Sequence, residues 1–257
     1  MLDIDAIAYL VETDIQGNSL KLGEIAREDL PKFIQQIAEI VPDHYISPES
    51  IADTLERLGK RAAAEKLRIK LPETKKLRSG DVGEILAKDY VEESTVYSVP
   101  VSKLRWRDHQ NMPMRGDDVI GFYDRGSNQS LKYLKVEAKS SQTLGRATMG
   151  GARKELDSYD GKPSPHALTF IAERLREIGN EDLSNKIELA QYKDGIRANQ
   201  VEHLLFTLTG SNPENMHKEA LTEYSDGYSQ KAVGLRAKDH KQLIEGVFNE
   251  VANKNDA

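Results

Sequence analysis

Two carboxylates and one lysine stand at positions in this chain that suit phosphodiester chemistry. Asp118 comes directly before the apolar run 119–123, and Glu137 and Lys139 end the next such run. Residues two apart on a strand share a face, so Glu137 and Lys139 point the same way while Ala138 points to the other face. If the two runs pair, we expect the three charged side chains to meet at one end of the pair.

This set of side chains matches what hydrolysis of a phosphodiester requires. Carboxylates are the hard oxygen ligands that hold Mg²⁺ or Mn²⁺. The divalent ion activates a water and neutralises charge, and a nearby lysine orients the water, takes its proton or offsets the developing charge. This is the layout of the PD-(D/E)xK phosphodiesterases, so the residues predict a metal-dependent nuclease.

A third carboxylate is expected from a helix that begins near Ser79. Glu84 follows the Gly-Asp-Val-Gly stretch 80–83, and its glycines allow the helix to approach a sheet closely. Glu84 would then complete the metal ligands. Asp117 competes with Asp118 for its place; we prefer Asp118 because it abuts the apolar run, and we expect Asp117 to be a supporting or capping residue.

Each feature also has an ordinary structural explanation. A Glu-x-Lys at a strand end is commonly a solvated edge in a chain whose charged residues make up 30%. The combination is more specific, because an Asp opens one β run, a turn follows, a Glu-x-Lys closes the next run and a Gly-Glu helix lies upstream. This combination favours the nuclease site.

Composition sets limits on the class of protein. The 257 residues suffice for one large domain or two small ones. The net charge of -6 argues against a protein that simply coats nucleic acid, and the absence of cysteine excludes disulfides and zinc ribbons. No apolar run approaches the roughly 20 residues that span a bilayer, and the N-terminus has no basic lead-in, so we expect a cytoplasmic protein with no membrane contact.

The first part of the chain reads as mostly helical. A weak strand pair is expected around Gln16-Gly17-Asn18. A helix follows from Asp29 and should end before Pro42. Ser47 then caps another helix, with proline at its first position.

The charge balance changes between residues 57 and 78. Nine basic and two acidic residues give this segment a net charge of +7. We place a domain boundary at its end, with an N-terminal region 1–78 for contact with a partner or DNA and a nuclease domain 79–257. The basic segment follows either a phosphate backbone or an acidic partner surface, and both interpretations stay open.

The rest of the chain mixes strand and helix patterns. This mixture predicts an α/β fold with a restriction-endonuclease-like core, a central mixed sheet flanked by helices. The turn between the two runs at the site is expected at 124–128. Strands are expected at 95–104, 119–123, 131–136, 201–209 and 232–238, and helices at 149–158, 164–179, 181–192 and 240–251.

Several cations near the site are expected to contact DNA. Alternation along a strand at 95–104 and beyond would place Lys103, Arg105 and Arg107 on one face. Arg115, just before Asp117, is also within reach of a phosphate. The residues expected to bind DNA are Lys75, Lys76, Arg78, Lys103, Arg105, Arg107 and Arg115.

Four motifs, in order, resemble a known family. They are RSGDVGEIL at 78–86, VPVSKLR at 99–105, GDDVIG at 116–121 and VEAKSS at 136–141. Together they resemble the HamA effector nucleases of Hachiman anti-phage defence systems, over about residues 78–141.

The resemblance implies more than the residues alone. It implies a PD-(D/E)xK fold in which Glu84, Asp118, Glu137 and Lys139 match the family's catalytic positions. It also implies a partner, the superfamily 2 helicase HamB, which holds the nuclease inactive until unusual DNA is sensed.

Three functions remain open on the sequence. The chain is a defence nuclease released by a helicase, a restriction-type endonuclease with its own sequence specificity, or a non-catalytic protein that binds DNA or a helicase. The first should cut DNA with little preference, and the second should cut at defined sites. The complete set of Asp118, Glu137 and Lys139 argues against the third.

Overall fold

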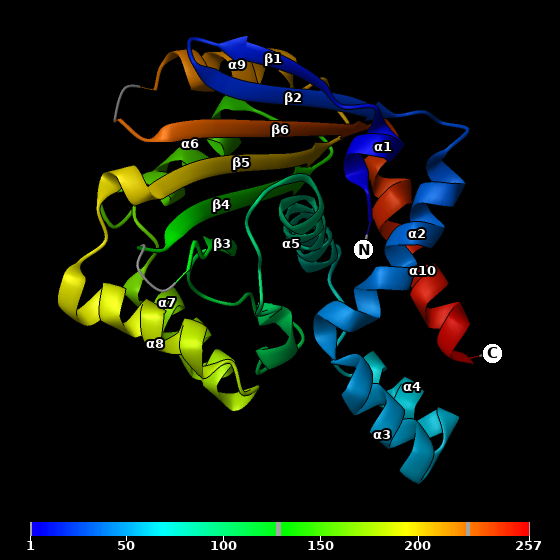
Figure 1. Ribbon diagram of the computed structural model, residues 1–257. Helices are drawn as coiled ribbons and strands as arrows, with labels where there is room; N and C mark the ends of the chain where they lie inside the picture. The colour runs from blue at the N-terminus through cyan, green and yellow to red at the C-terminus, as the bar shows by residue number, and fades with distance from the viewer. Residues whose placement is uncertain (1, 127–129, 225–226, 257) are drawn as a thin grey trace.

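A six-stranded mixed sheet forms the centre of the computed structural model, which describes residues 2–126, 130–224 and 227–256 (Figure 1). The strand order is β1-β2-β6-β5-β4-β3. The outer pairs β1–β2 and β3–β4 are antiparallel, and the inner pairs are parallel. The strands are β1 (Val11–Ile15), β2 (Asn18–Ile25), β3 (Val119–Tyr123), β4 (Lys132–Ser141), β5 (Val201–Thr209) and β6 (Ser229–Ala237).

Helices cover both faces of the sheet, which confirms the predicted α/β architecture (Figure 1). One face carries α5 with α2 and α10, and the other carries α6 and α9. No helix within the described ranges is long and apolar enough to cross a membrane. The helices are α1 (Ile4–Ala8), α2 (Leu30–Tyr45), α3 (Pro48–Leu58), α4 (Lys60–Arg68), α5 (Lys75–Ser94), α6 (Arg146–Asp157), α7 (Pro165–Glu177), α8 (Glu181–Leu189), α9 (Glu214–Thr222) and α10 (His240–Asp256), with a 3₁₀ turn η1 (Lys103–Trp106).

Alternation along β4 decides which side chains reach which layer. Leu134 and Val136 belong to the main core beneath α5, whereas Tyr133 packs in a second core with α7. Glu137 and Lys139 therefore lie on the face opposite α5. The prediction placed both residues at the end of a strand that stopped at residue 136. Strand β4 continues to Ser141, so both residues lie inside it.

The N-terminal strands belong to the same sheet as the proposed site. The predicted pair around Gln16-Gly17 is confirmed, and both turn residues have positive φ. Strand β2 then pairs in parallel with β6. The boundary near residue 78 stays a prediction; it falls within α5, and strands from both sides of it share one sheet.

Two helix ends differ from the prediction because tertiary contacts stabilise extra turns. Helix α2 continues through Pro42 to Tyr45, whose hydroxyl donates to Asp81, and His44 pairs with Asp89 at 3.2 Å. Helix α5 begins at Lys75, before the expected start, because the Thr74 hydroxyl accepts a hydrogen bond from the backbone of the helix's first turn. Helix α9 (Glu214–Thr222) was not predicted from the sequence.

The predicted strand at 95–104 is wrong. Only an isolated bridge joins Ser98 to Phe122, and the chain then turns into η1 at Lys103. Pro100 has no N–H for a strand ladder, which limits pairing there. The turn after β3 is partly described: the Gly126 N–H donates to the Asp124 carboxylate at 2.9 Å, while residues 127–129 lie outside the described residues.

Candidate active site

Helix α5 approaches the sheet closely where it carries Glu84. A Cβ added at Gly83 would lie 3.0 Å from the Cβ of Ser140, so a larger residue there would push the helix away from β4. The hydroxyl of Ser79 also donates to the Ser140 carbonyl at 3.1 Å. These contacts hold α5 against the end of β4 and bring Glu84 to the site.

Asp118 ties the start of β3 to β4. Its carboxylate accepts a hydrogen bond of 2.9 Å from the backbone N–H of Ala138, the residue between Glu137 and Lys139. Asp117 has a different role, because it accepts the Ser164 N–H at 2.8 Å and lies 3.5 Å from the ammonium of Lys135. Asp118 therefore lies beside the Glu137–Lys139 segment, whereas Asp117 contacts the residue that precedes α7.

Glu137 and Lys139 form a close ion pair on β4. The lysine ammonium donates to a carboxylate oxygen of Glu137, whose side chain is only 8% exposed. The predicted common face of the two residues is confirmed. Burial, and then the negative charge of Asp118, raise the pKa of Glu137 to about 8.

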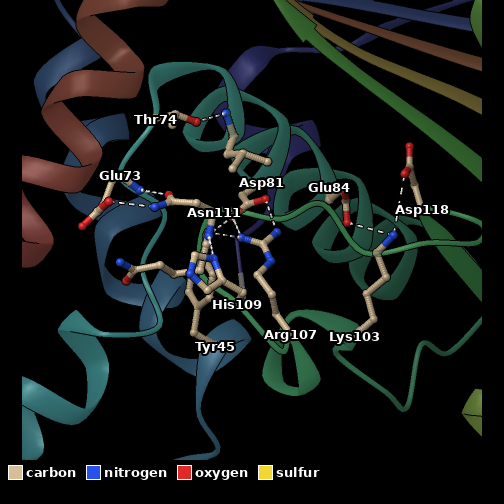
Figure 2. Close-up of polar contacts among 12 residues, drawn as sticks. Tyr45, Glu73, Thr74, Asp81, Glu84, Lys103, Arg107, His109, Asn111 and Asp118 are labelled. Atoms are coloured by element: carbon tan, nitrogen blue, oxygen red, sulfur yellow. Dashed lines mark hydrogen bonds and ion pairs between the residues drawn. The ribbon is translucent and has the colours of Figure 1, made fainter.

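Lys103 enters the site from η1 and not from a strand (Figure 2). Its ammonium lies 3.1 Å from a Glu84 oxygen and 3.7 Å from an Asp118 oxygen, and it donates to the Asp117 carbonyl at 3.1 Å. The sequence pattern predicted that Lys103 contacts DNA from a strand. Nothing in that strand pattern indicated that its ammonium would lie beside Glu84 and Asp118.

The electrostatics of the cluster favour an additional positive charge. Burial raises the pKa of Glu84 to about 7; Lys103 partly offsets this rise and Asp118 adds to it. Burial disfavours the charged form of Lys139, but Glu137 and Asp118 outweigh burial and raise its pKa, so Lys139 keeps its proton at neutral pH. Three carboxylates thus share two ammonium groups.

The donor set fits a hard divalent cation. Glu84, Asp118 and Glu137 offer only carboxylate oxygens, the ligands that Mg²⁺ and Mn²⁺ prefer. The buried oxygen of Glu84 is contacted by the Lys103 ammonium at 3.1 Å and by no other polar group of the described residues. As the side chains stand, no three acidic or imidazole groups among the described residues lie close enough together to hold an ion, and Lys103 occupies the space between Glu84 and Asp118.

A cavity of about 600 Å³ opens beside Glu84 and Asp118. The rings of Trp106 and Phe170 meet edge to face on its wall with centroids 6.0 Å apart. Arg115 also lines this cavity and is exposed. The cavity therefore offers apolar surface and positive charge next to the carboxylates.

Two cations assigned to DNA from the sequence are engaged elsewhere. Arg107 is buried and donates two bonds, of 2.5 and 2.7 Å, to Asp81 (Figure 2). This burial does not support a DNA contact, and it follows because the segment is not the strand that the alternation required. Arg105 donates to the Asp43 carbonyl at 2.8 Å.

The basic residues at the start of α5 line a second cavity, of about 510 Å³. Lys75 is exposed although it pairs with Glu245 at 2.6 Å, and Arg78 donates to the Pro72 carbonyl at 2.8 Å. Lys76 is exposed, and Gln142 lies in the same cavity, outside the carboxylate cluster. These residues stay candidates for DNA contact.

Comparison with known proteins gives a family for the whole chain. The HamA family model matches residues 4–251. The Hachiman protein HamA of Bacillus cereus is 24% identical over 178 residues, which are 69% of this chain and 62% of that protein, so the chain spans less than two thirds of this relative.

A second group of relatives covers a smaller part of longer proteins. Two ATP-dependent helicase/deoxyribonuclease subunits, one from Thermoanaerobacter sp. and one from Thermoanaerobacter pseudethanolicus, are each 25% identical over 158 residues, or 60% of this chain and 13% of each relative. The family match, in contrast, extends over nearly all of the chain and includes the segments around Glu84, Asp118 and Glu137. The chain belongs to the HamA family.

Proposed function

We propose that this chain is a metal-dependent deoxyribonuclease with a PD-(D/E)xK core that acts as the effector of a Hachiman anti-phage system. The observation that carries the proposal is that Asp118 lies between two groups: it shares Lys103 with Glu84, and it accepts the N–H of Ala138, the residue between Glu137 and Lys139. Membership of the HamA family supports the defence role. The word deoxyribonuclease in the names of the Thermoanaerobacter relatives agrees with the chemistry.

The carboxylates would hold Mg²⁺ or Mn²⁺, and such an ion, when bound, activates a water and neutralises phosphate charge. The hydrogen bond from the Ala138 N–H would fix the orientation of the Asp118 carboxylate. Glu84 would be held by the close packing of α5 on β4.

Lys139 would supply positive charge at the reacting phosphate. Its pKa is raised by Glu137 and Asp118 against the effect of burial, so it acts as an ammonium and not as a base that takes a proton from water. A fixed ammonium next to a developing negative charge stabilises the transition state more than the ground state. The cavity beside Glu84 and Asp118 would receive the DNA strand.

A partner helicase would control this activity. Family membership makes HamB the expected partner, and it would keep the nuclease silent until it senses unusual DNA. The exposed basic residues Lys75 and Lys76 are candidate contacts for DNA or for an acidic surface of the helicase.

The proposal is tested by cleavage of supercoiled plasmid with purified protein, alone and with HamB and ATP. We expect relaxation and loss of the plasmid with Mg²⁺, none with EDTA and none with Lys139→Ala. Lys132→Ala is the matched control, because Lys132 lies at the other end of the same strand. Discrete fragments would indicate a restriction-type enzyme, and absence of cleavage in every arm would overturn the proposal.

A further inference from the structure

Lys103 occupies the space that a cation at the proposed site would need. Its ammonium lies between carboxylate oxygens of Glu84 and Asp118, at 3.1 and 3.7 Å (Figure 2). A compact ammonium between two carboxylates supplies the same charge neutralisation that a metal ion would supply. Its side chain is 14% exposed, so this lysine is not a surface residue that meets the site by chance.

The backbone around Lys103 is anchored on both sides. Leu104 is buried in the core, and Arg105 bonds to the Asp43 carbonyl of α2. Arg107 is buried with its two bonds to Asp81. These contacts fix η1 and aim the Lys103 side chain at the carboxylates.

The carboxylates need this cation when no metal is present. Two acidic groups brought together in a partly buried site repel each other unless a positive charge lies between them. The buried oxygen of Glu84 faces the Lys103 ammonium at 3.1 Å and has no other polar partner in the described part of the chain, so Lys103 is the group that offsets its charge. The Lys103 ammonium would repel a divalent ion bound by Glu84 and Asp118, because both are positively charged.

We propose that Lys103 is a built-in competitor of the divalent metal, which holds the site closed to metal until it is displaced. This inference rests on the proposed metal site and adds a regulatory residue to it. The resting protein then binds Mg²⁺ or Mn²⁺ weakly. Any contact that draws Lys103 away from Glu84, such as a DNA phosphate in the adjoining cavity, raises the affinity of the carboxylates for metal.

Calorimetric titration of the full chain with Mn²⁺, without DNA, tests this inference. We expect Lys103→Met and Lys103→Gln to bind Mn²⁺ at least about tenfold more tightly than the wild type, a change of about 1.4 kcal/mol. Lys103→Arg keeps the cation and should bind as weakly as the wild type. Adding Glu137→Gln to Lys103→Met should remove the gain, which shows that the ion sits at the proposed site.

Lys88 offers a matched control. It lies on α5 one turn after Glu84 and lines the same cavity, and its side chain is also 14% exposed, but it pairs with Glu92 and not with Glu84 or Asp118. Lys88→Met should leave Mn²⁺ affinity unchanged, and thermal melting should show that each variant is folded.

The outcomes separate this inference from the function on which it rests. Equal Mn²⁺ affinity of the wild type and both uncharged Lys103 variants would overturn the competitor role while leaving the metal site intact. Absence of binding to every variant would overturn the metal site, and the competitor role with it. Metal binding without plasmid cleavage would count against the nuclease alone.

Discussion

Helix α5 carries two carboxylates three residues apart, Asp81 and Glu84, and each belongs to a charged cluster that is neutralised in a different way. Asp81 receives two bonds from Arg107 and one from the Tyr45 hydroxyl, and all three residues are buried. Glu84, less than one turn further on, has a buried oxygen whose one charged neighbour among the described contacts is the Lys103 ammonium, 3.1 Å away.

The difference lies in the balance of charge. The first cluster joins one carboxylate to one guanidinium, whose planar donors match its two oxygens. The second cluster joins three carboxylates to two ammonium groups, and burial raises the pKa of Glu84 to about 7 and of Glu137 to about 8. These raised pKa values leave the two glutamates partly protonated at neutral pH, which is typical of functional sites, whereas a matched buried ion pair is typical of structure.

The largest expected effect is loss of activity at the second cluster. Lys139→Ala or Glu137→Ala should lower the rate of plasmid cleavage by about 10²- to 10⁴-fold, because each removes a group next to the reacting phosphate. Thermal melting should show little loss of stability. A strongly lowered melting temperature in both variants would make the second cluster structural as well, and the contrast with Asp81 would disappear.

The next largest effect is loss of stability at the first cluster. Arg107→Met should lower the free energy of unfolding by about 3–5 kcal/mol, because it leaves the carboxylate of Asp81 buried without its cation. Urea denaturation measures the change. Arg105→Met is the control and should cost much less, since Arg105 bonds only to a backbone carbonyl near the surface. Equal losses in the two variants would contradict the structural role of the Asp81 pair.

Glu137→Gln is expected to raise the thermal stability at high pH, by less than Arg107→Met lowers the free energy of unfolding. The pKa of Glu137 is raised from 4.5 to about 8, so the folded state binds more protons than the unfolded state between these values. Its contribution to stability therefore falls as pH rises through this window. Glu137→Gln should melt higher than the wild type at pH 9 and equally at pH 4, in EDTA.

Asp81→Asn is the counterpart of that experiment. It should melt lower than the wild type at neutral pH, because Arg107 loses its charged partner. If Glu137→Gln also melts lower at pH 9, the ion pair with Lys139 outweighs the burial of Glu137, and both clusters are stabilised by their charges.

The smallest effect is expected outside both clusters. Lys76→Glu and Arg115→Glu should each weaken DNA binding modestly and lower the slope of log affinity against log salt by about 1, as loss of one phosphate contact does. Fluorescence anisotropy with a labelled duplex measures this. Lys193→Glu is the control, since Lys193 is exposed and lines neither cavity. Unchanged affinity in both variants would limit the DNA contacts to the carboxylate site.

Local patterns predicted the β3–β4 part of the site well. Alternation along one strand places Glu137 and Lys139 on a common face whatever surrounds them, and the apolar run after Asp118 marks where β3 begins. Asp118 contacts the segment between Glu137 and Lys139, whereas Asp117 contacts Ser164; the choice of Asp118 as the metal ligand stays a prediction. Periodicity likewise predicted strands β5 and β6 and helices α6, α7, α8 and α10, with shifted ends.

The segment between α5 and β3 could not be predicted in the same way. Val and Tyr residues there resemble a strand, but the position of Lys103 depends on carboxylates from two other elements. Arg107 likewise looks like a surface cation until Asp81 and Tyr45 enclose it. Helix α2 passes Pro42 for the same reason, since distant partners stabilise its last turn.

Strand alternation and turn chemistry act over a few residues, so the α/β class, the common face of Glu137 and Lys139 and the place of Asp118 before β3 could be predicted from the chain alone. Three features arise only in the folded molecule: Lys103 lies between Glu84 and Asp118, Arg107 is buried, and residues 11–25 join the sheet that carries the site. These outcomes depend on charges and backbone groups brought together from far apart in the chain. Their energies arise only when burial removes them from water.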